Sequence, residues 1–343
     1  MRARLNLVTG GAGFIGGHLV RLLVQRGERV RVLDLEAPEG AADGVEAIRG
    51  SICERETVRR AVAGASCVFH LAGNPNLWDR DKSSFLAVNA EGTRNVIEEA
   101  ERAGVERIVH TSTESILKSV RRAAPLPITG EEAALEPEDM PGPYAVSKLL
   151  GERAAMEAAA RGAPVVVVNP TMPLGPGDRR LTPPTRMILG FLNGETPAYL
   201  DCVFNVVDVR HAALGHVLAA EKGRVGERYV LGGANVSMGE LLAVLGRITG
   251  LAMPRLRVPY AAAVAFAWAS EMVADRVTHR APVAPLTGVR LARTAMIFDS
   301  SKARDELGLP VTSLDQTLTD AVAWLAANGH VRRALPHRVA AAV

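Results

Sequence analysis

The sequence predicts an α/β protein: a doubly wound parallel sheet followed by a smaller, mainly helical region. Two observations predict this class. Short apolar runs alternate with helix-length segments through residues 5–168, and the first run leads through a glycine-rich turn into a segment of helical periodicity. Strands joined by helix-length connections take right-handed crossovers, so they form a parallel sheet with helices on both faces.

The first apolar run, residues 5–8, is followed by three glycines, Gly10, Gly13 and Gly16, spaced GxxGxxG. Gly10 permits a tight turn, Gly13 lets a pyrophosphate approach the backbone, and Gly16 lets the next helix pack close to the strand. That helix begins near Phe14 and Ile15, where free N–H groups and the helix dipole favour an anion. The pattern predicts a dinucleotide-binding Rossmann turn, with an ordinary tight turn as the alternative.

Asp34 ends the second predicted strand, residues 29–33, eighteen positions after Gly16. A carboxylate there accepts hydrogen bonds from a ribose diol and repels a 2′-phosphate. No arginine stands immediately beside Asp34 in the sequence, which favours NAD over NADP. The alternative is that Asp34 only caps the strand end.

Composition excludes several classes of protein. The 343 residues are 48% hydrophobic, which is ample for a core, and the interspersed charges sum to only +3, so we expect no nucleic-acid partner. Cys53, Cys67 and Cys202 lack CxxC spacing, which predicts neither a disulfide framework nor a metal site and suits the cytoplasm. The chain enters a strand without a signal-peptide pattern.

The most apolar later stretch, residues 261–269, is followed by Glu271 and Asp275. Spanning a bilayer takes roughly 20 apolar residues, so we expect no membrane span. The favoured interpretation is a core helix or a wall of the substrate site. The alternative is contact with a membrane surface or a lipidic substrate.

Taken in order, the remaining elements predict two interlocked regions. Further strands are expected at residues 45–49, 67–71, 107–111 and 165–168, and Pro and Gly become dense from residue 170. We assign 1–169 to a cofactor-binding domain whose sheet is completed by strands near 204–209 and 228–231. Residues 170–203 and 232–329 form the substrate-binding region, and 330–343 a mobile tail.

Candidate catalytic residues follow the fifth strand. Thr113 lies just beyond residues 107–111, and Tyr144 and Lys148 stand four positions apart on a predicted helix. The ammonium group of Lys148 would lower the pKa of the phenol, which could then remove a hydroxyl proton as hydride leaves carbon for nicotinamide. Thr113 would hold the substrate oxygen. The alternative is a surface tyrosine beside a solvated lysine.

The motif order TGGAGFIG, Asp34, VFHLAG, NxxGTxN, HTST, PYAVSK and NPTMPLGPGD resembles the extended short-chain dehydrogenase/reductases, the epimerase/dehydratase superfamily, over residues 4–328. The resemblance implies that Tyr144 is the catalytic acid/base, that Lys148 contacts the nicotinamide ribose, and that Thr113 and Asn89 complete the catalytic set. The implied NAD-binding residues are Gly10, Gly13, Phe14, Ile15, Gly16, Asp34, Ser51, Ile52, Leu71, Ala72, Gly73, Asn89, Thr111, Tyr144, Lys148, Pro170 and Thr171.

Departures from the family pattern concern the substrate more than the cofactor. Ser51 stands where many members carry an adenine-contacting Asp, and Met172 where nucleotide-sugar enzymes carry an Asn. A thioether cannot replace an amide as a hydrogen-bond donor. The later sequence looks most like the hopanoid-associated sugar epimerase branch, with dihydroflavonol-reductase and 3β-hydroxysteroid-dehydrogenase relatives nearby.

Candidates for substrate contact are Asn74, Trp78, Glu114, Met172 and Phe191. Glu114 follows Thr113 as an acid does in the family's 4,6-dehydratases, but Ser115 replaces the usual second acid, so a polar strand-end role is favoured. The large apolar candidates fit a lipophilic pocket or, more simply, core.

The hypothesis is a cytoplasmic NAD-dependent oxidoreductase that takes hydride from a secondary alcohol of a sugar-like or lipophilic small molecule. Return of the hydride gives an epimerase, and release of NADH gives a net redox enzyme. A catalytically silent NAD-sensing protein is the third alternative. Family resemblance also implies a homodimer through helices near residues 90–103 and 144–160.

Overall fold

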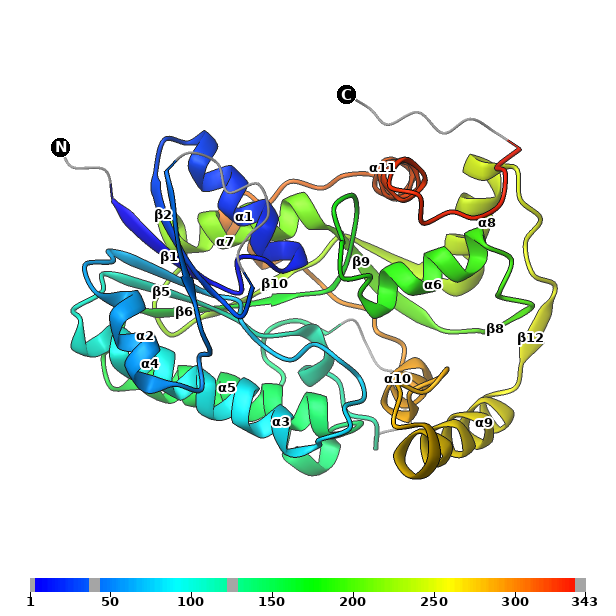
Figure 1. Cartoon of the computed structure of the whole chain (residues 1–343), viewed down its shortest axis with the longest axis horizontal. Helices are drawn as coiled ribbons and strands as arrows, with labels where there is room; N and C mark the ends of the chain where they lie inside the picture. The colour runs from blue at the N-terminus through cyan, green and yellow to red at the C-terminus, as the bar shows by residue number, and fades with distance from the viewer. Residues whose placement is uncertain (1–3, 37–43, 122–128, 337–343) are drawn as a thin grey trace.

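The computed structural model describes residues 4–36, 44–121 and 129–336, and its largest feature is a seven-stranded, wholly parallel sheet (Figure 1). The strand order is β10-β6-β5-β4-β1-β2-β3. This order reverses direction between β1 and β4, which confirms the predicted doubly wound class. The strands are β1 (Leu5–Thr9), β2 (Arg29–Asp34), β3 (Val45–Arg49), β4 (Cys67–His70), β5 (Arg107–Thr111), β6 (Val165–Pro170) and β10 (Arg228–Leu231).

Helices cover both faces of this sheet (Figure 1). On one face lie α1 (Phe14–Gln25) and α7 (Val209–Lys222), and on the other α2 (Arg55–Val62), α4 (Thr93–Arg102) and α5 (Pro143–Ala160). Successive strand residues point to opposite faces, so Val166 and Val168 enter the first core while Val165 and Val167 enter the second. Burial on both faces explains why these strands are continuously apolar in sequence.

The second region has its own smaller core. Its three-stranded sheet has the order β11-β9-β7, and β8 pairs with β12. The strands are β7 (Met172–Leu174), β8 (Ala198–Leu200), β9 (Val203–Asp208), β11 (Ala234–Ser237) and β12 (Leu256–Val258). The helices are α6 (Pro183–Leu192), α8 (Met238–Thr249), α9 (Tyr260–Val273), α10 (Leu286–Arg293) and α11 (Leu314–Ala327).

Short turns of helix complete the described elements. They are α3 (Ser83–Leu86), η1 (Ala87–Gly92), η2 (Glu114–Ile116), η3 (Pro137–Asp139), η4 (Ala274–Thr278) and η5 (Ala303–Leu307). α3, η1 and α4 follow one another without a break, so the single helix predicted to begin near Phe85 contains a wider π-type turn.

The expectation that residues 204–209 return to the main sheet is wrong. The edge beside β6 is taken by β10, with Tyr229 in register with Val168, as expected for 228–231. β9 instead pairs with β7 and β11, beyond the point where Pro170 ends β6. The apolar pattern of a strand shows that the strand is buried, but it does not identify the neighbouring strand with which it pairs.

Part of the predicted mobile tail is docked. His330 and Arg332 are bonded to Asn193, at the end of α6, and Val331 and Leu335 pack on the core of the second region. Residues 337–343 of that tail lie outside the described part of the chain.

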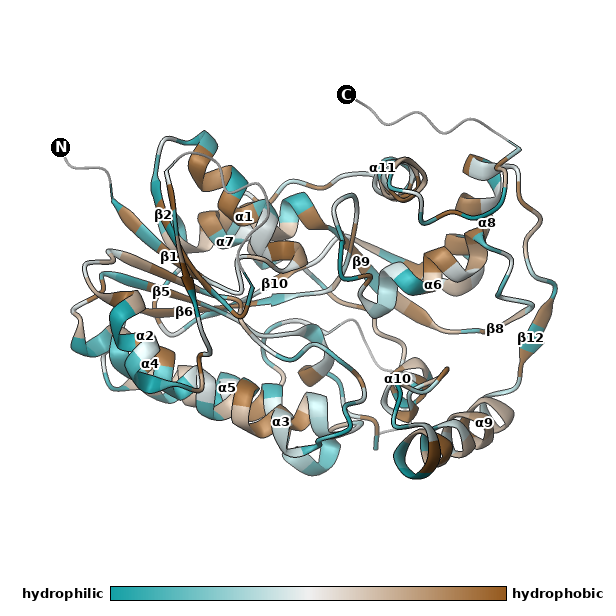
Figure 2. Cartoon of the chain, in the orientation of Figure 1, coloured by the Kyte–Doolittle hydropathy of each residue, from teal (hydrophilic) through white to brown (hydrophobic). Residues whose placement is uncertain are grey.

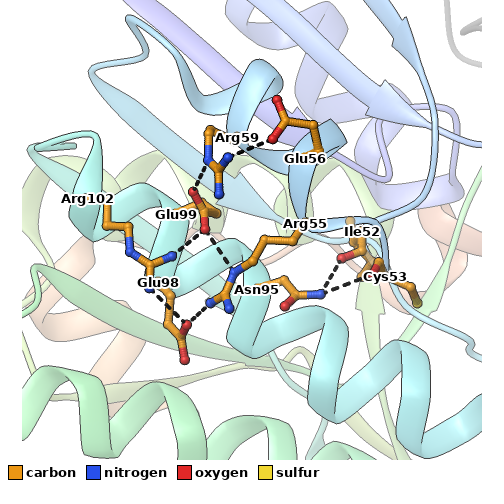
Figure 3. Close-up of polar contacts among 9 residues, drawn as sticks. All are labelled: Ile52, Cys53, Arg55, Glu56, Arg59, Asn95, Glu98, Glu99 and Arg102. Atoms are coloured by element: carbon orange, nitrogen blue, oxygen red, sulfur yellow. Dashed lines mark hydrogen bonds and ion pairs between the residues drawn. The ribbon is translucent and has the colours of Figure 1, made fainter.

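A charged cluster fastens α2 to α4 (Figure 3). The Glu99 side chain is only 1% exposed, and it accepts hydrogen bonds from Arg55 (2.9 Å), Arg59 (3.1 Å) and Arg102. On the same helix Asn95 donates to the carbonyl of Ile52 at 3.1 Å. The turn after β3 is thereby held at the end of the sheet where cofactor contacts are predicted.

Within the three described stretches, every helix is too short or too polar to cross a bilayer. Figure 2 shows that the most hydrophobic segments are the strands of the main sheet, which the two helical layers cover.

Candidate active site

The carboxyl ends of β1, β4, β5 and β6 meet along one edge of the sheet. Thr9 is in register with His70, His70 with His110, and Thr111 with Val168. The glycine turn, the 71–74 turn, residues 112–115 and residues 170–171 therefore emerge side by side. Ligands of such sheets bind outside this edge.

The turn after β1 requires glycine for steric reasons. Gly10 has φ +75°, and a Cβ there would lie 2.6 Å from the backbone nitrogen of Ala72. A Cβ on Gly16 would lie 2.1 Å from the carbonyl oxygen of Gly10. Gly13 is the N-cap of α1, which then begins at Phe14 and Ile15, both half-buried. The first amides of a helix have no intrahelical acceptor, so this cradle fits the pyrophosphate of a dinucleotide.

Asp34 is held against this turn, at the end of β2. Its Oδ2 accepts from the backbone N–H of Ala12 at 3.0 Å, and the side chain is 8% exposed. The sequence suggested that no arginine lies beside it, but Arg180 lies 3.7 Å from its Oδ1 and 3.0 Å from Glu36. The sequence could not show this neighbour because it comes from a loop nearly 150 positions away.

Asn89 lies in the π-type turn η1 and is 1% exposed. Its Oδ1 accepts from the backbone N–H of Asn74 at 2.8 Å, and its Nδ2 donates to the Asn74 carbonyl at 3.1 Å and to Ser147 Oγ at 3.0 Å. Such turns are frequent at functional sites. Asn89 thus connects the 73–74 turn to α5. It also lies close to Gly73: a Cβ added at Gly73 would be 3.0 Å from the Asn89 Oδ1.

Four polar side chains converge beyond β5. Thr113 Oγ1 donates to Glu114 Oε2 at 2.9 Å and lies 3.1 Å from Ser115 Oγ. The phenol of Tyr144, in the first turn of α5, lies beside Thr113 and Ser115, whose hydroxyls act to lower its pKa. Burial raises the pKa of Glu114 to about 7, against the hydrogen bond from Thr113. A hydroxyl and carboxyl cluster of this kind can hold and protonate a substrate oxygen.

The expected lowering of the Tyr144 pKa by Lys148 is not what the structure shows. Burial raises the pKa of Tyr144 to about 12, and the nearby charge of Glu114 adds to this. Lys148 Nζ instead donates to the carbonyl of Thr111 at 2.7 Å. Burial lowers the pKa of Lys148 to about 8, opposed by Glu152. The phenol is therefore held in its neutral form.

The remaining predicted cofactor residues lie around the same edge. Leu71 and Ala72 are half-buried, and the Ala72 N–H donates to Thr9 Oγ1 at 3.2 Å. Pro170 and Thr171 are buried, and Thr171 is bonded to the Leu231 carbonyl.

Ser51 and Ile52 lie on the turn after β3. The Ser51 hydroxyl accepts from the Cys53 N–H at 3.1 Å. Ile52 is 5% exposed and packs against Gly92, where a Cβ would lie 2.7 Å from its Cδ1. Of these two, Ser51 is the residue more accessible to a ligand.

The predicted substrate residues separate into two groups. Glu114 and Asn74 lie in the site, where Asn74 also donates to Asp79 at 2.8 Å. Phe191 is 4% exposed within the core of the second region, and Met172 packs on that core. Trp78 is buried, with its Nε1 donating to Asp275 at 2.8 Å. The buried contacts of Phe191 and Trp78 therefore favour the core alternative over substrate contact.

Four polar residues around the site carry no sequence signal strong enough to predict them. Ser115 and Ser147 complete the hydrogen bonds of Thr113 and Asn89. Glu152 accepts from Asn169 at 2.7 Å and from Arg228 at 2.8 Å. His70 lies between Thr9 and Thr93, and burial lowers its pKa to about 3. The spacing from Tyr144 through Lys148 to Glu152, four positions at each step, is the one pattern that could have indicated Glu152.

Fold and site together define an α/β oxidoreductase that binds a dinucleotide. The family model described as "NAD dependent epimerase/dehydratase family" matches residues 6–232. The chain belongs to this family, and its cofactor is NAD.

Comparisons over nearly the whole chain agree. The chain is 37% identical to the "Putative dihydroflavonol 4-reductase" of Synechocystis sp. over 338 residues, covering 95% of each. It is 34% identical to "Sterol demethylase protein B" of Methylococcus capsulatus, covering 95% of this chain and 99% of that one. The crystal structure of MoeE5 with UDP-glucuronic acid and NAD is 25% identical, with a TM-score of 0.75, covering 94% of this chain and 99% of that chain. These findings confirm an NAD-dependent enzyme of the short-chain dehydrogenase/reductase type.

Proposed function

We propose that the protein interconverts a secondary alcohol and a ketone on a lipophilic small molecule, with Tyr144 as the acid/base. The observation that carries this proposal is the convergence of Tyr144, Thr113, Ser115 and Glu114 at the carboxyl end of β5. These residues follow β5 or pack beside its end, and β5 is the neighbour of β4 in the sheet. The turn after β4 is hydrogen-bonded to Thr9, directly before the glycine turn of residues 10–16.

Proton transfer follows from the protonation state of the phenol. In the reductive direction, neutral Tyr144 donates its proton to the carbonyl oxygen as the carbonyl carbon receives hydride, and the product is the alcohol. In the oxidative direction, the deprotonated Tyr144 oxygen takes up the alcohol proton as the C–H bond breaks and the hydride leaves the carbinol carbon. NAD, when bound, is the hydride acceptor. The high pKa of Tyr144 favours the reductive role in the resting site.

Lys148 and Thr113 have separate roles in this proposal. Thr113 Oγ1, within hydrogen-bond reach of both the phenol and Glu114, orients the substrate oxygen. Lys148 holds the end of β5 through Thr111 and presents its ammonium group at the predicted position of the nicotinamide ribose. Asn89 keeps the facing turn at Asn74 in place.

The preference for a lipophilic substrate rests on Met172 and on the names of the relatives. Met172 offers no amide where sugar-nucleotide enzymes carry one. One relative is named a reductase, which describes net redox chemistry, and another is named a sterol demethylase protein, which describes lipid chemistry. Neither name describes epimerisation.

A second candidate is epimerisation of a sugar by return of the hydride to the opposite face. The family description and the UDP-glucuronic acid bound in MoeE5 favour it.

The first test replaces Tyr144 by Phe. Loss of the hydroxyl should lower turnover by at least about 100-fold because general acid–base catalysis contributes about that much or more. The dissociation constant for NAD, measured by calorimetry, should change by less than about threefold. Tyr260→Phe is the matched control, since Tyr260 lies on α9. Unchanged turnover in the Tyr144→Phe protein would remove Tyr144 from its assigned role.

A further inference from the structure

α9 exposes large apolar side chains to solvent. Ala267 is its one buried residue, although the helix is among the most apolar in the chain. Phe266 and Trp268 are each 58% exposed and Val273 49% exposed. The expectation of a core helix at residues 261–269 is therefore wrong.

Most of the exposed apolar residues share one side of the helix, whereas Trp268, two positions from Phe266, lies on the other side, in the groove beside α10. Ala262, Phe266, Ala269 and Val273 follow helical spacing along an exposed stripe, and Val277 continues it in η4 at 72% exposed. Figure 2 shows few hydrophilic residues along this helix. An ordinary surface helix directs its apolar stripe inward, so α9 has the reverse arrangement.

The polar residues of α9 point toward the protein. Ser270 Oγ accepts from the N–H of Val283 at 3.1 Å, and Glu271 accepts from the N–H of Leu286 at 3.3 Å. Lys82 lies 4.0 Å from Glu271 and 3.3 Å from Asp275. These bonds fix the rotation of the helix, so its apolar side stays outward.

Exposed apolar residues concentrate around α9. Of the ten large apolar side chains most exposed in the described ranges, six lie within residues 256–283. The six are Leu256, Phe266, Trp268, Val273, Val277 and Val283, and we call the outward stripe of Phe266, Val273 and Val277 the α9 face. Clustered exposed apolar side chains mark interaction sites, whereas single ones are ordinary.

The same part of the chain holds the protein's excess positive charge. Residues 255–293 contain six arginines against Glu271 and Asp275, a charge of +4, whereas the whole chain carries +3. The six arginines are all exposed. Two of them, Arg290 and Arg293, line an apolar groove of about 540 Å³ between α9 and α10, together with Trp268. Cationic and apolar side chains thus share one surface.

We propose that the α9 face docks this protein on the surface of an anionic phospholipid bilayer, with α9 lying in the plane of the interface. Phe266, Val273 and Val277 would enter the boundary between headgroups and acyl chains, and the arginines would meet the phosphates. The helix has 14 residues, about 21 Å at 1.5 Å per residue, which is too short to span roughly 30 Å of hydrocarbon.

Charge argues for a lipid surface over a second copy of the chain. Pairing two α9 faces would bring together two surfaces that each carry the +4 segment, which is unfavourable. Figure 1 places α9 at the end of the molecule away from the parallel sheet. The inference does not depend on the substrate.

The test is sedimentation with vesicles of phosphatidylglycerol and phosphatidylcholine, compared with phosphatidylcholine alone. The wild type should sediment with the anionic vesicles, and raising the salt concentration should release it because surface charges are screened. The double variant F266S/V273S, which changes two residues of the α9 face, should lose at least about tenfold in partitioning. Both residues are exposed, so folding should be retained, as near-ultraviolet circular dichroism would verify. V311S is the matched control, since Val311 is 57% exposed outside this face.

The following outcomes would contradict the proposal. Wild type that stays in solution with anionic vesicles, or that binds neutral vesicles equally well, would overturn it. So would a V311S protein that loses binding as F266S/V273S does. Light scattering that shows a dimer dispersed by F266S/V273S, without vesicle binding, would assign the face to a second copy. Catalytic activity does not enter any of these readouts, so failure here leaves the proposed function untouched.

Discussion

At the scale of single residues, Glu114 has the clearest dependence on pH. Its ordinary pKa is 4.5, and burial raises it to about 7. Between those two values the folded state holds a proton that the unfolded state has lost, so the free energy of unfolding falls as pH rises from about 4.5 to 7. Above pH 7 the folded protein carries the full cost of a buried charge.

Glu114→Gln should remove that dependence. We expect the variant to gain stability relative to the wild type at pH 8 and to change little at pH 5, as measured by urea unfolding at the two values. Glu157→Gln, on the exposed side of α5, provides the control. Equal pH slopes in the Glu114→Gln and wild-type proteins would show that Glu114 ionises normally.

Asp34 and Arg180 make a second prediction at this scale. Asp34→Asn should weaken NAD binding by roughly tenfold, because a charged acceptor becomes a neutral one. It should also strengthen NADP binding, because Arg180 is left beside the ribose position with less competing charge. Adding Arg180→Ala should abolish that gain. Fluorescence titration with both cofactors measures these changes, and an unchanged NADP affinity in Asp34→Asn would place the ribose elsewhere.

Some of these residues could be read from the sequence and others could not. Gly10, Gly16, Asp34, Tyr144 and Lys148 stand in local patterns whose spacing reflects one turn or one helix. Arg180 contacts Asp34 and Asp275 contacts Trp78, and each pair is far apart in the sequence. Local spacing of residues therefore cannot predict these contacts. The rise in the Tyr144 pKa has no local sequence signal either, since burial depends on the whole fold.

At the scale of elements, the strand, glycine turn and helix at the N-terminus depend on close backbone packing. Gly16→Ala should destabilise the protein by at least about 2 kcal/mol because the new Cβ would lie 2.1 Å from the Gly10 carbonyl oxygen. NAD binding should be lost with it.

The neighbouring glycine is a matched control. A Cβ on Gly17 would meet no atom closer than 3.8 Å, so Gly17→Ala should stabilise α1 by about 0.5–1 kcal/mol. Thermal unfolding measures both variants. Similar melting temperatures for the two would contradict the close packing inferred at Gly16.

Elements were predictable where their surroundings are local. The predicted strands at 107–111 and 228–231 match β5 and β10, because continuous apolar runs between turns identify buried strands. The strand near 204–209 exists as β9, but its pairing with β7 and β11 was not predictable, because strand pairing is a tertiary property. The π-type turn at Asn89 could not be predicted either, because it does not change the helical periodicity of the sequence.

At the scale of the whole molecule, we predict a homodimer through α4 and α5, the helices that cover residues near 90–103 and 144–160. These helices pack side by side on one face of the main sheet (Figure 1), whereas α9 lies in the second region. Dimerisation and membrane docking would therefore use different surfaces. Light scattering at micromolar concentration should give twice the mass of the 36.4 kDa chain, and a monomer alone would refute the prediction.

The central claim is that this NAD-dependent enzyme performs net oxidoreduction at a carbinol carbon beside Tyr144. The most direct measurement is a single turnover with NAD and a panel of lipophilic secondary alcohols deuterated at the carbinol carbon, followed by mass spectrometry of the cofactor and the product. The account predicts deuterated NADH in stoichiometric amounts together with the ketone, and none of either with the Tyr144→Phe protein. Deuterium retained in an inverted alcohol, without accumulated NADH, would contradict net oxidoreduction and identify an epimerase.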